Sequence, residues 1–252
     1  MTHRPQIPSP HGGEGRVRGA VSRGAVSRGA VSRGAVALLA ACALFFPVAA
    51  PAQTDLDAVV DGLESTYGKM NDLKAEFTQV ARNKSLGQDV KAEGTVYLKK
   101  GGKMRWEYKS PSPQQIVSDG TFLWVYTPEL NQVNKGDAPK ALAGPAGSFL
   151  QGLGKVREEF TVRFLNPANK TDGAGRPVLD LTPKKPTPLL TRLVLTLDPK
   201  ENYIVRQAVL YDQLQNTVTM SFNRVLVNPG LSDTLFAFTP PKGTAVVPLE
   251  IR

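Results

Sequence analysis

Histidine and cysteine are missing from most of this 252-residue chain. The two histidines, His3 and His11, and the single cysteine, Cys42, all lie within the first 52 residues. Residues 53–252 therefore cannot form a Ser-His-Asp triad, a Cys-His dyad, a zinc site built on His or Cys, an iron–sulfur cluster or a disulfide framework. What remains open to this part of the chain is carboxylate chemistry, a Ser-Lys pair or binding without catalysis.

Motifs that hold nucleotide cofactors are also absent. Val156 follows Gly154-Lys155 where a P-loop has Ser or Thr, and Phe149 stands where it needs its first glycine. Arg157 occupies the place of the third glycine in a dinucleotide-binding loop. We therefore expect no cofactor, no metal site and no catalytic residue.

The chain has no apolar run long enough to span a membrane comfortably. Residues 35–48 form an uncharged stretch of about 14 residues, against the roughly 20 that a span needs. Arginines precede this stretch, and Ala50-Pro51-Ala52 follows it with the small-x-small pattern of a signal peptidase site. Residues 1–52, which contain Arg-Gly-Ala-Val-Ser repeats, are therefore predicted to be a secretory signal segment that is cleaved after Ala52.

A second interpretation of this leader stays open. Leu39-Ala40-Ala41-Cys42 matches the lipobox of bacterial lipoproteins, in which the cysteine becomes acylated. Against it, residues 43–46 are apolar, whereas a lipoprotein cysteine is normally followed by a polar linker. The two interpretations predict different mature N-termini, Gln53 or an acylated Cys42.

The excess of positive charge is concentrated in the leader. Residues 1–52 hold six arginines and one acid, which give +5 of the formal net charge of +9 and leave only +4 for the rest. So small an excess on an exported chain gives no reason to expect a nucleic-acid partner. Four basic residues gather around one expected turn, either as a solvated hairpin tip or as a docking patch for an acidic partner or anionic headgroups: Lys99, Lys100, Lys103 and Arg105.

The remaining 200 residues predict one domain, 53–252, that opens with a helix. Thr54 is the expected cap, and apolar residues then recur at helical spacing: Leu56, Val59, Val60, Leu63, Tyr67 and Met70. After Asp72 the apolar period changes to two, and short turn signals such as Asp119-Gly120 predict an antiparallel meander.

The strand pattern is interrupted once and then resumes. Between residues 131 and 157 the only predicted element is a short helix at 148–153. The alternation of apolar and polar residues returns at Phe160. A last strand is expected at 236–238, after which Pro240-Pro241 should end the pairing. About ten or eleven strands result, enough to curl into a barrel or to divide into two packed sheets, with the helices covering an open barrel.

The stretch from Gly94 to Val133 resembles the signature region of the LolA family, periplasmic carriers of outer-membrane lipoproteins. The matching pieces are Phe77-Thr78-Gln79, Met104-Arg105-Trp106-Glu107-Tyr108, Val117-Ser118-Asp119-Gly120, Leu123-Trp124-Val125-Tyr126 and Phe238-Thr239-Pro240-Pro241-Lys242-Gly243. The resemblance covers about residues 53–245, although between Gly136 and Lys200 it rests on pattern more than on residues. It implies a mainly β, β-rich α+β fold: an unclosed antiparallel barrel whose N-terminal helix and short helical insertion act as a lid over a hydrophobic cavity.

The resemblance also implies candidate site residues. For the lipid-binding cavity they are Phe77, Val96, Leu98, Trp106, Tyr108, Ile116, Trp124 and Tyr126, with Leu150 and Leu153 from the lid. Alternation alone does not decide which face of the sheet these side chains occupy, and an ordinary filled core fits the pattern equally well. For a lid latch or partner docking they are Lys100, Met104 and Arg105; Lys100 stands where relatives have arginine and lacks the planar guanidinium fork.

The function implied by the resemblance is transport without catalysis. A monomeric chaperone would receive acylated lipoproteins from an inner-membrane ABC-type release complex and pass them to an outer-membrane acceptor, where one is present. A LolB-like membrane-anchored acceptor and a lipid-sensing envelope-stress regulatory domain of the same fold stay open as alternatives. Composition also leaves open an esterase or glycosidase with a Ser-Lys or two-carboxylate site.

Overall fold

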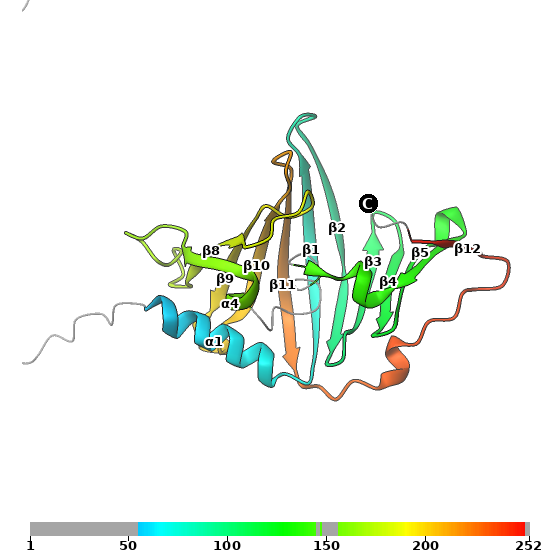
Figure 1. The fold of residues 1–252 in the computed structure, drawn as a ribbon, viewed down its shortest axis with the longest axis horizontal. Helices are drawn as coiled ribbons and strands as arrows, with labels where there is room; N and C mark the ends of the chain where they lie inside the picture. Colours follow the sequence, from blue (N-terminus) through cyan, green and yellow to red (C-terminus); the bar gives the residue numbers. More distant parts are fainter. Residues whose placement is uncertain (1–54, 145–146, 148–155, 250–252) are drawn as a thin grey trace, which may run out of the picture. The chain divides into compact units, whose positions relative to one another are not determined.

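The computed structural model describes residues 55–144, 147 and 156–249, so the predicted leader and the predicted helix at 148–153 lie outside the described residues. The described residues contain one sheet of twelve strands in the order β12-β6-β5-β4-β3-β2-β1-β11-β10-β9-β8-β7 (Figure 1). The strands are β1 (Asp72–Asn83), β2 (Gln88–Lys99), β3 (Lys103–Ser110), β4 (Gln114–Asp119), β5 (Phe122–Thr127), β6 (Gln132–Asp137), β7 (Phe160–Phe164), β8 (Val178–Pro183), β9 (Arg192–Asp198), β10 (Ile204–Tyr211), β11 (Thr217–Val227) and β12 (Ala245–Pro248).

The sheet is open, because β7 and β12 end the strand order and each has a single neighbour within the described part of the chain. All neighbouring strands pair antiparallel except β12 and β6, which are parallel. The predicted unclosed antiparallel sheet is thus confirmed, with twelve strands instead of ten or eleven. Short helices join the strands: η1 (Pro128–Leu130), α2 (Ala138–Ala141), α4 (Val156–Glu159) and η2 (Pro199–Glu201).

The first element is the predicted amphipathic helix, α1 (Leu56–Lys69). Its N-cap is Asp55, whose Oδ1 accepts a hydrogen bond from the Asp57 amide at 3.2 Å, so the expected cap at Thr54 was wrong. Tyr67 connects the apolar stripe to the sheet, since its hydroxyl accepts a hydrogen bond from the Val205 amide of β10 at 3.2 Å. Burial raises the pKa of Tyr67 to about 12.

Strands β1 to β5 form the predicted meander, and its tightest connection is the Asp119-Gly120 turn. Gly120 has a φ of 94°, a conformation that other residues rarely adopt. The Asp119 carboxylate accepts hydrogen bonds from the Thr121 and Phe122 amides, both at 2.7 Å. This turn fixes the register between β4 and β5, and therefore which side chains share a face.

Side chains alternate between two faces of the sheet. Trp106 pairs with Ile116, and both lie on what we call the inner face. Arg105 pairs with Val117, and Val117 pairs with Trp124, so these three lie on the opposite, outer face. Inner-face side chains and α1 together form the main apolar cluster, whereas a smaller cluster lies on the outer face of β4, β5 and β6.

Residues 228–249, which we call the C-terminal strap, cross the outer face. The strap contains η3 (Asp233–Phe236), which contacts β3 and β4, and ends in β12 beside β6 (Figure 1). The predicted strand at 236–238 was wrong, because Ser232 caps a helical turn through the Thr234 amide at 3.3 Å, and Phe236 is fully buried. Pairing also does not stop at Pro240-Pro241, since β12 follows them as an edge strand.

Candidate functional site

The inner face of β1, β2 and β3 carries three consecutive rows of side chains. Cross-strand register defines the rows as Leu73-Leu98-Met104, Ala75-Val96-Trp106 and Phe77-Gly94-Tyr108. All of these residues are buried except Tyr108, which is partly buried. Neighbouring strands thus build a continuous apolar surface, which is what a site for hydrocarbon requires.

Gly94 makes room for the aromatic part of this surface. A Cβ at this position would lie 2.0 Å from the backbone oxygen of Glu107 and 2.8 Å from Cζ of Phe77. Any larger residue would therefore push β3 and the Phe77 ring away. The glycine allows Phe77 to lie over β2 and to meet the aromatic side chains of β3.

Four aromatic rings meet edge to face across β1, β3 and β11. The Phe77 ring lies 5.1 Å from that of Trp106 and 5.0 Å from that of Tyr108, and the rings of Trp106 and Phe222 are 6.4 Å apart. Such contacts add to the energy of burial but constrain position only loosely. The buried Nε1 of Trp106 has no hydrogen-bond partner among the described residues.

The inner face becomes polar toward the end of the sheet where β1 turns into β2. There the Tyr108 hydroxyl donates a hydrogen bond to Oε1 of Gln79 at 3.1 Å, and Nε2 of Gln114 donates to Oγ1 of Thr127 at 3.2 Å. Burial raises the pKa of Tyr108, so its hydroxyl stays protonated well above neutral pH. The apolar rows are therefore bordered at this end by a pair of side-chain hydrogen bonds.

Strands β8, β9 and β10 complete the apolar cluster beneath α1. The helix contributes Val59, Val60 and Leu63. The strands contribute a set of leucines that have no exposed surface: Leu179, Leu181, Leu193, Leu195 and Leu197. This half of the inner face is packed as an ordinary core, so α1 is held mainly by apolar burial.

Arg157 of α4 fastens the N-terminal half of α1. Its guanidinium Nη1 lies 2.7 Å from Asp61 Oδ1 and 2.7 Å from Glu64 Oε2, and Nη2 lies 3.5 Å from Asp57 Oδ1. The Arg157 amide also donates to Glu64 Oε1 at 2.7 Å. We call this set the α1 latch; its acids are largely exposed except Glu64, so it is weaker than the apolar contacts below it.

A pocket of about 420 Å³ lies beside the α1 latch, between α1 and β7. Its apolar lining comes from Leu56, Val60, Phe160 and Val162, and charged side chains such as Arg157 stand at its edge. A gap of this kind marks the place where α1 and β7 are least tightly packed.

The structure divides the predicted cavity residues between the two faces. Phe77, Val96, Leu98, Trp106, Tyr108 and Ile116 come together on the inner face. Trp124 and Tyr126 do not join them, because they lie on the outer face and contact Phe238 of the strap at ring distances of 6.0 and 5.9 Å. The prediction that all eight side chains line a single cavity was therefore wrong.

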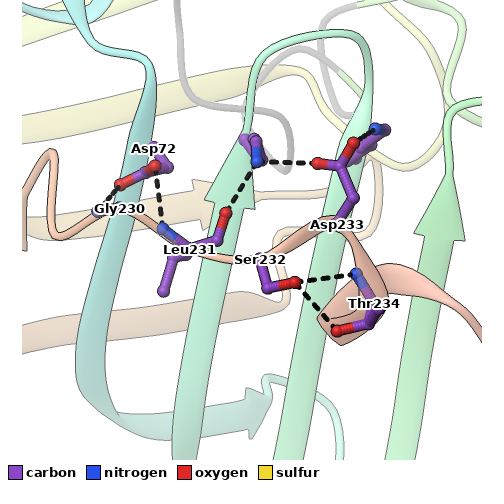
Figure 2. Close-up of polar contacts among 8 residues, drawn as sticks. Asp72, Gly230, Leu231, Ser232, Asp233 and Thr234 are labelled. Carbon is purple, nitrogen blue, oxygen red and sulfur yellow. Dashed lines mark hydrogen bonds and ion pairs between the residues drawn. The ribbon is translucent and has the colours of Figure 1, made fainter.

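The strap is fixed to the sheet by charged groups. Figure 2 shows the buried Asp72 carboxylate accepting hydrogen bonds from the Gly230 and Leu231 amides at 3.1 and 3.0 Å. Asp233 pairs with Lys99 at 2.6 Å and with Lys103 at 2.8 Å. Hydrogen bonds from these two lysines lower the pKa of Asp233 to about 2.

The residues predicted for a latch or for docking have three different positions. Arg105 lies on the outer face and donates to the Leu235 backbone oxygen of the strap at 3.2 Å. Met104 is fully buried on the inner face, where a partner cannot reach it. Lys100 is exposed, and its amide donates to the Asn71 oxygen. The lid candidates, Leu150 and Leu153, lie outside the described residues.

Two fixing residues were missed from the sequence, Arg157 and Asp72. Asp57, Asp61 and Glu64 are spaced along one side of a helix, which indicates that a cation lies close to them. Their spacing does not identify the cationic residue. In the sequence, Asp72 marks only the point at which the apolar period changes from helical spacing to two. No local pattern relates it to amides 158 and 159 residues away.

The open sheet, with its apolar inner face covered by a helix, defines a half-barrel binding protein. None of the helices within the described ranges is both long and apolar enough to cross a membrane. A family model described as "Outer membrane lipoprotein carrier protein LolA" matches residues 68–239. That match includes more than half of the chain, and the chain belongs to the LolA family.

Curated relatives agree with this membership. An outer-membrane lipoprotein carrier protein of Dechloromonas aromatica is 30% identical over 83% of this chain and 95% of the relative, and one of Chromobacterium violaceum is 31% identical over 83% and 96%. Among solved structures, an uncharacterized conserved protein from Thermus thermophilus has a TM-score of 0.49 at 14% identity, over 77% of this chain and 98% of that one. A LolA superfamily protein from Nitrosomonas europaea has a TM-score of 0.42 at 12% identity, over 74% and 99%.

Proposed function

We propose that this protein carries acylated lipoproteins through the periplasm, with their acyl chains held against the inner face of the sheet. The observation that carries the proposal is the set of three apolar rows across β1, β2 and β3, with hydrogen-bonded polar pairs beyond the row that contains Tyr108. Hydrocarbon would lie along the rows, and the polar linkage of the cargo would lie near Tyr108 and Gln114.

The free energy of hydration explains why such a carrier is needed. A triacylated lipoprotein has on the order of 45 methylene or methyl groups, and each costs about 0.8 kcal/mol when it is exposed to water. The total is tens of kcal/mol, so the cargo cannot cross an aqueous compartment unprotected. The inner face offers burial with few directional contacts, which suits chains that must also leave.

The transport cycle we propose needs no catalysis in this chain. A monomer accepts its cargo from an inner-membrane ABC-type release complex, which supplies the energy, and passes it to an outer-membrane acceptor or to the membrane. Relatives named "Outer-membrane lipoprotein carrier protein" support lipoproteins as the cargo. We further propose that residues 53–252 are the mature carrier domain and that the leader is removed after Ala52.

Two matched variants test the inner face as the cargo site. Trp106→Glu places a charge among the apolar rows and should abolish the uptake of a purified triacylated lipoprotein, measured by co-elution after release from detergent. Trp124→Glu places the same charge on the outer face and should leave uptake at half the wild-type level or more. Ile116→Lys provides a second inner-face change in a partly buried position, and circular dichroism of each variant checks the fold. Equal uptake by the Trp106 and Trp124 variants would show that the inner face is not the binding surface.

A cellular experiment tests the carrier role itself. Depletion of the protein should leave outer-membrane lipoproteins in the inner membrane, as measured by density fractionation of the two membranes. Normal sorting after depletion would contradict the proposal. Mass spectrometry of the mature N-terminus separates a carrier beginning at Gln53 from a membrane-anchored acceptor acylated at Cys42.

A further inference from the structure

The most exposed apolar side chains gather at one end of the sheet. Among the described residues, four large apolar side chains are more than two-thirds exposed: Leu86 at 68%, Leu130 at 69%, Leu189 at 73% and Leu214 at 74%. They lie in the connections β1–β2, β5–β6, β8–β9 and β10–β11, respectively. Because neighbouring strands in this part of the sheet are antiparallel, all four connections fall at the same end.

Hydrogen bonds hold three of these connections together. The Lys84 amide at the β1–β2 tip donates to Oδ1 of Asn216 at 3.0 Å, and the Gln213 amide donates to the Pro188 oxygen of the β8–β9 connection at 3.0 Å. Leu86, Leu189 and Leu214 therefore project from adjoining tips, which we call the leucine rim. The β1–β2 hairpin rises beyond the neighbouring strands in Figure 1, and each of the three leucines is at least 68% exposed.

Positive charge accompanies the leucines. Lys84 and Lys185 are exposed beside the rim, and within the described part of the chain neither ammonium group has an ion-pair partner. The acid of the β10–β11 connection, Asp212, accepts hydrogen bonds from the amide and side chain of Asn216 at 2.8 and 2.7 Å. The cations at the rim are thus available to an external anion.

We propose that the leucine rim docks on the surface of a bilayer that contains anionic phospholipid. The leucines would enter between the headgroups, while Lys84 and Lys185 contact lipid phosphates. This interaction goes beyond the proposed carriage of cargo, since none of the rim residues belongs to the inner face. It would place the sheet end that carries the polar pairs of Tyr108 and Gln114 toward the membrane.

The form of the rim favours a membrane over a protein partner. Each leucine stands on its own tip and is at least 68% exposed, whereas protein interfaces usually offer a contiguous, well-packed apolar patch. Separate apolar tips next to cations match an interface that is soft, laterally mobile and negatively charged. A bilayer surface has these properties without requiring a complementary shape.

Flotation with lipid vesicles tests the proposal. The wild-type protein should float with vesicles of phosphatidylethanolamine and phosphatidylglycerol, less with phosphatidylcholine alone, and less at high salt. The triple variant Leu86→Ser, Leu189→Ser, Leu214→Ser should bind the anionic vesicles at least about a hundredfold more weakly, at roughly five- to tenfold for each leucine. Lys84→Gln with Lys185→Gln should reduce the preference for anionic over zwitterionic vesicles.

A leucine at the opposite end of the sheet provides the matched control. Leu226, near the end of β11, is 53% exposed, and Leu226→Ser should leave vesicle binding unchanged. Absence of wild-type binding, or equal binding by the triple variant, would overturn the proposal. So would sedimentation showing that the rim joins two copies of the chain without lipid. Lipoprotein uptake, measured on the same variants, should stay normal, which separates failure of the rim from failure of the carrier.

Discussion

Strand β3 carries two different kinds of surface on its two faces. Its inner side chains, Met104 and Trp106, are fixed by apolar packing and by edge-to-face ring contacts. Its outer side chains, Lys103 and Arg105, are fixed by hydrogen bonds and an ion pair to the strap, at defined distances. Residues that are adjacent in sequence thus belong to two separate systems.

The difference between the faces shows how one sheet can be firm and yet exchange its contents. Apolar contacts depend on buried area and little on direction, so under the proposed function acyl chains would exchange with side-chain contacts on the inner face. The outer face has directional bonds that a hydrocarbon cannot replace, so the strap keeps its place whether or not the inner face is occupied. Four variants test this division.

The strongest effect is expected from Gly94→Val. The new side chain would meet the Glu107 backbone oxygen, 2.0 Å from the Cβ position, and force β2 and β3 apart. We expect a loss of about 3–4 kcal/mol in the free energy of unfolding, measured with urea. Gly68→Ala in α1 meets no atom within 4 Å and should be neutral or stabilising by up to about 1 kcal/mol. Similar stability of the two variants would show that the inner rows are loosely packed.

Asp72→Ala should loosen the strap without changing the inner face. The variant leaves the Gly230 and Leu231 amides without their acceptor, at a cost of about 1–3 kcal/mol. In a Trp106→Phe background the fluorescence of Trp124 alone reports the strap, and we expect its emission to shift to the red at lower urea. Ser232→Ala, which removes only the cap of η3, should cost about 1 kcal/mol or less. An unshifted Trp124 transition would mean that the other contacts of the strap, which include the ion pairs of Asp233, hold it without Asp72.

Arg157→Gln should speed the exchange of cargo. It removes the ion pairs with Asp61 and Glu64, both at 2.7 Å, while the apolar stripe of α1 remains. Since such partly exposed pairs contribute up to about 1 kcal/mol, we expect the release rate of a fluorescent acyl ligand to rise about two- to fivefold. Arg163→Gln is the control and should leave the rate unchanged, because Arg163 is an exposed partner of the buried Asp180 carboxylate on β8, which keeps its ion pair with Arg192. Identical release rates for both variants would show that α1 does not control the release of the ligand.

The smallest effect is expected from Asp233→Asn, and it should depend on pH. The folded-state pKa of Asp233, about 2, is lower than its ordinary value near 4, so the ionised carboxylate stabilises the fold above that ordinary value. This stabilisation is lost as the pH falls from about 4 to about 2. The melting temperature of the variant should therefore lie slightly below that of the wild type at neutral pH, and the difference should shrink as the pH falls through about 2. A difference that stays constant as the pH falls through this range would assign the stabilisation to something other than these ion pairs.

The first half of the fold was predictable because its signals are local. The α1 stripe, the period-two strands and the Asp119-Gly120 turn each specify their own structure within a few residues. The inner-face set around Phe77 and Trp106 followed from the same alternation together with the family resemblance. Short-range pattern therefore predicted the strands, and the resemblance supplied the choice of side chains.

Face assignment and the C-terminal strap were not predictable in the same way. The side chains of Trp106 and Trp124 belong to opposite faces because of the register across the β3–β4 and β4–β5 turns, and a shift of one residue would reverse the result. Strand β6 has only Val133 buried, so it lacked the alternation that would have revealed it. The strap is specified by Asp72 and Asp233, whose partners are distant in sequence.

The link between Asp72 and the strap also orders the assembly of the molecule in time. The amides of Gly230 and Leu231 meet a carboxylate at the start of β1, across 158 and 159 positions of the chain. Until this last segment has been synthesised and exported, the cluster of Val117, Trp124 and Val133 lacks the cover of Phe238. A chain halted before its final two dozen residues would therefore present an adhesive sheet surface to its surroundings, and quality-control proteases could recognise it by that surface.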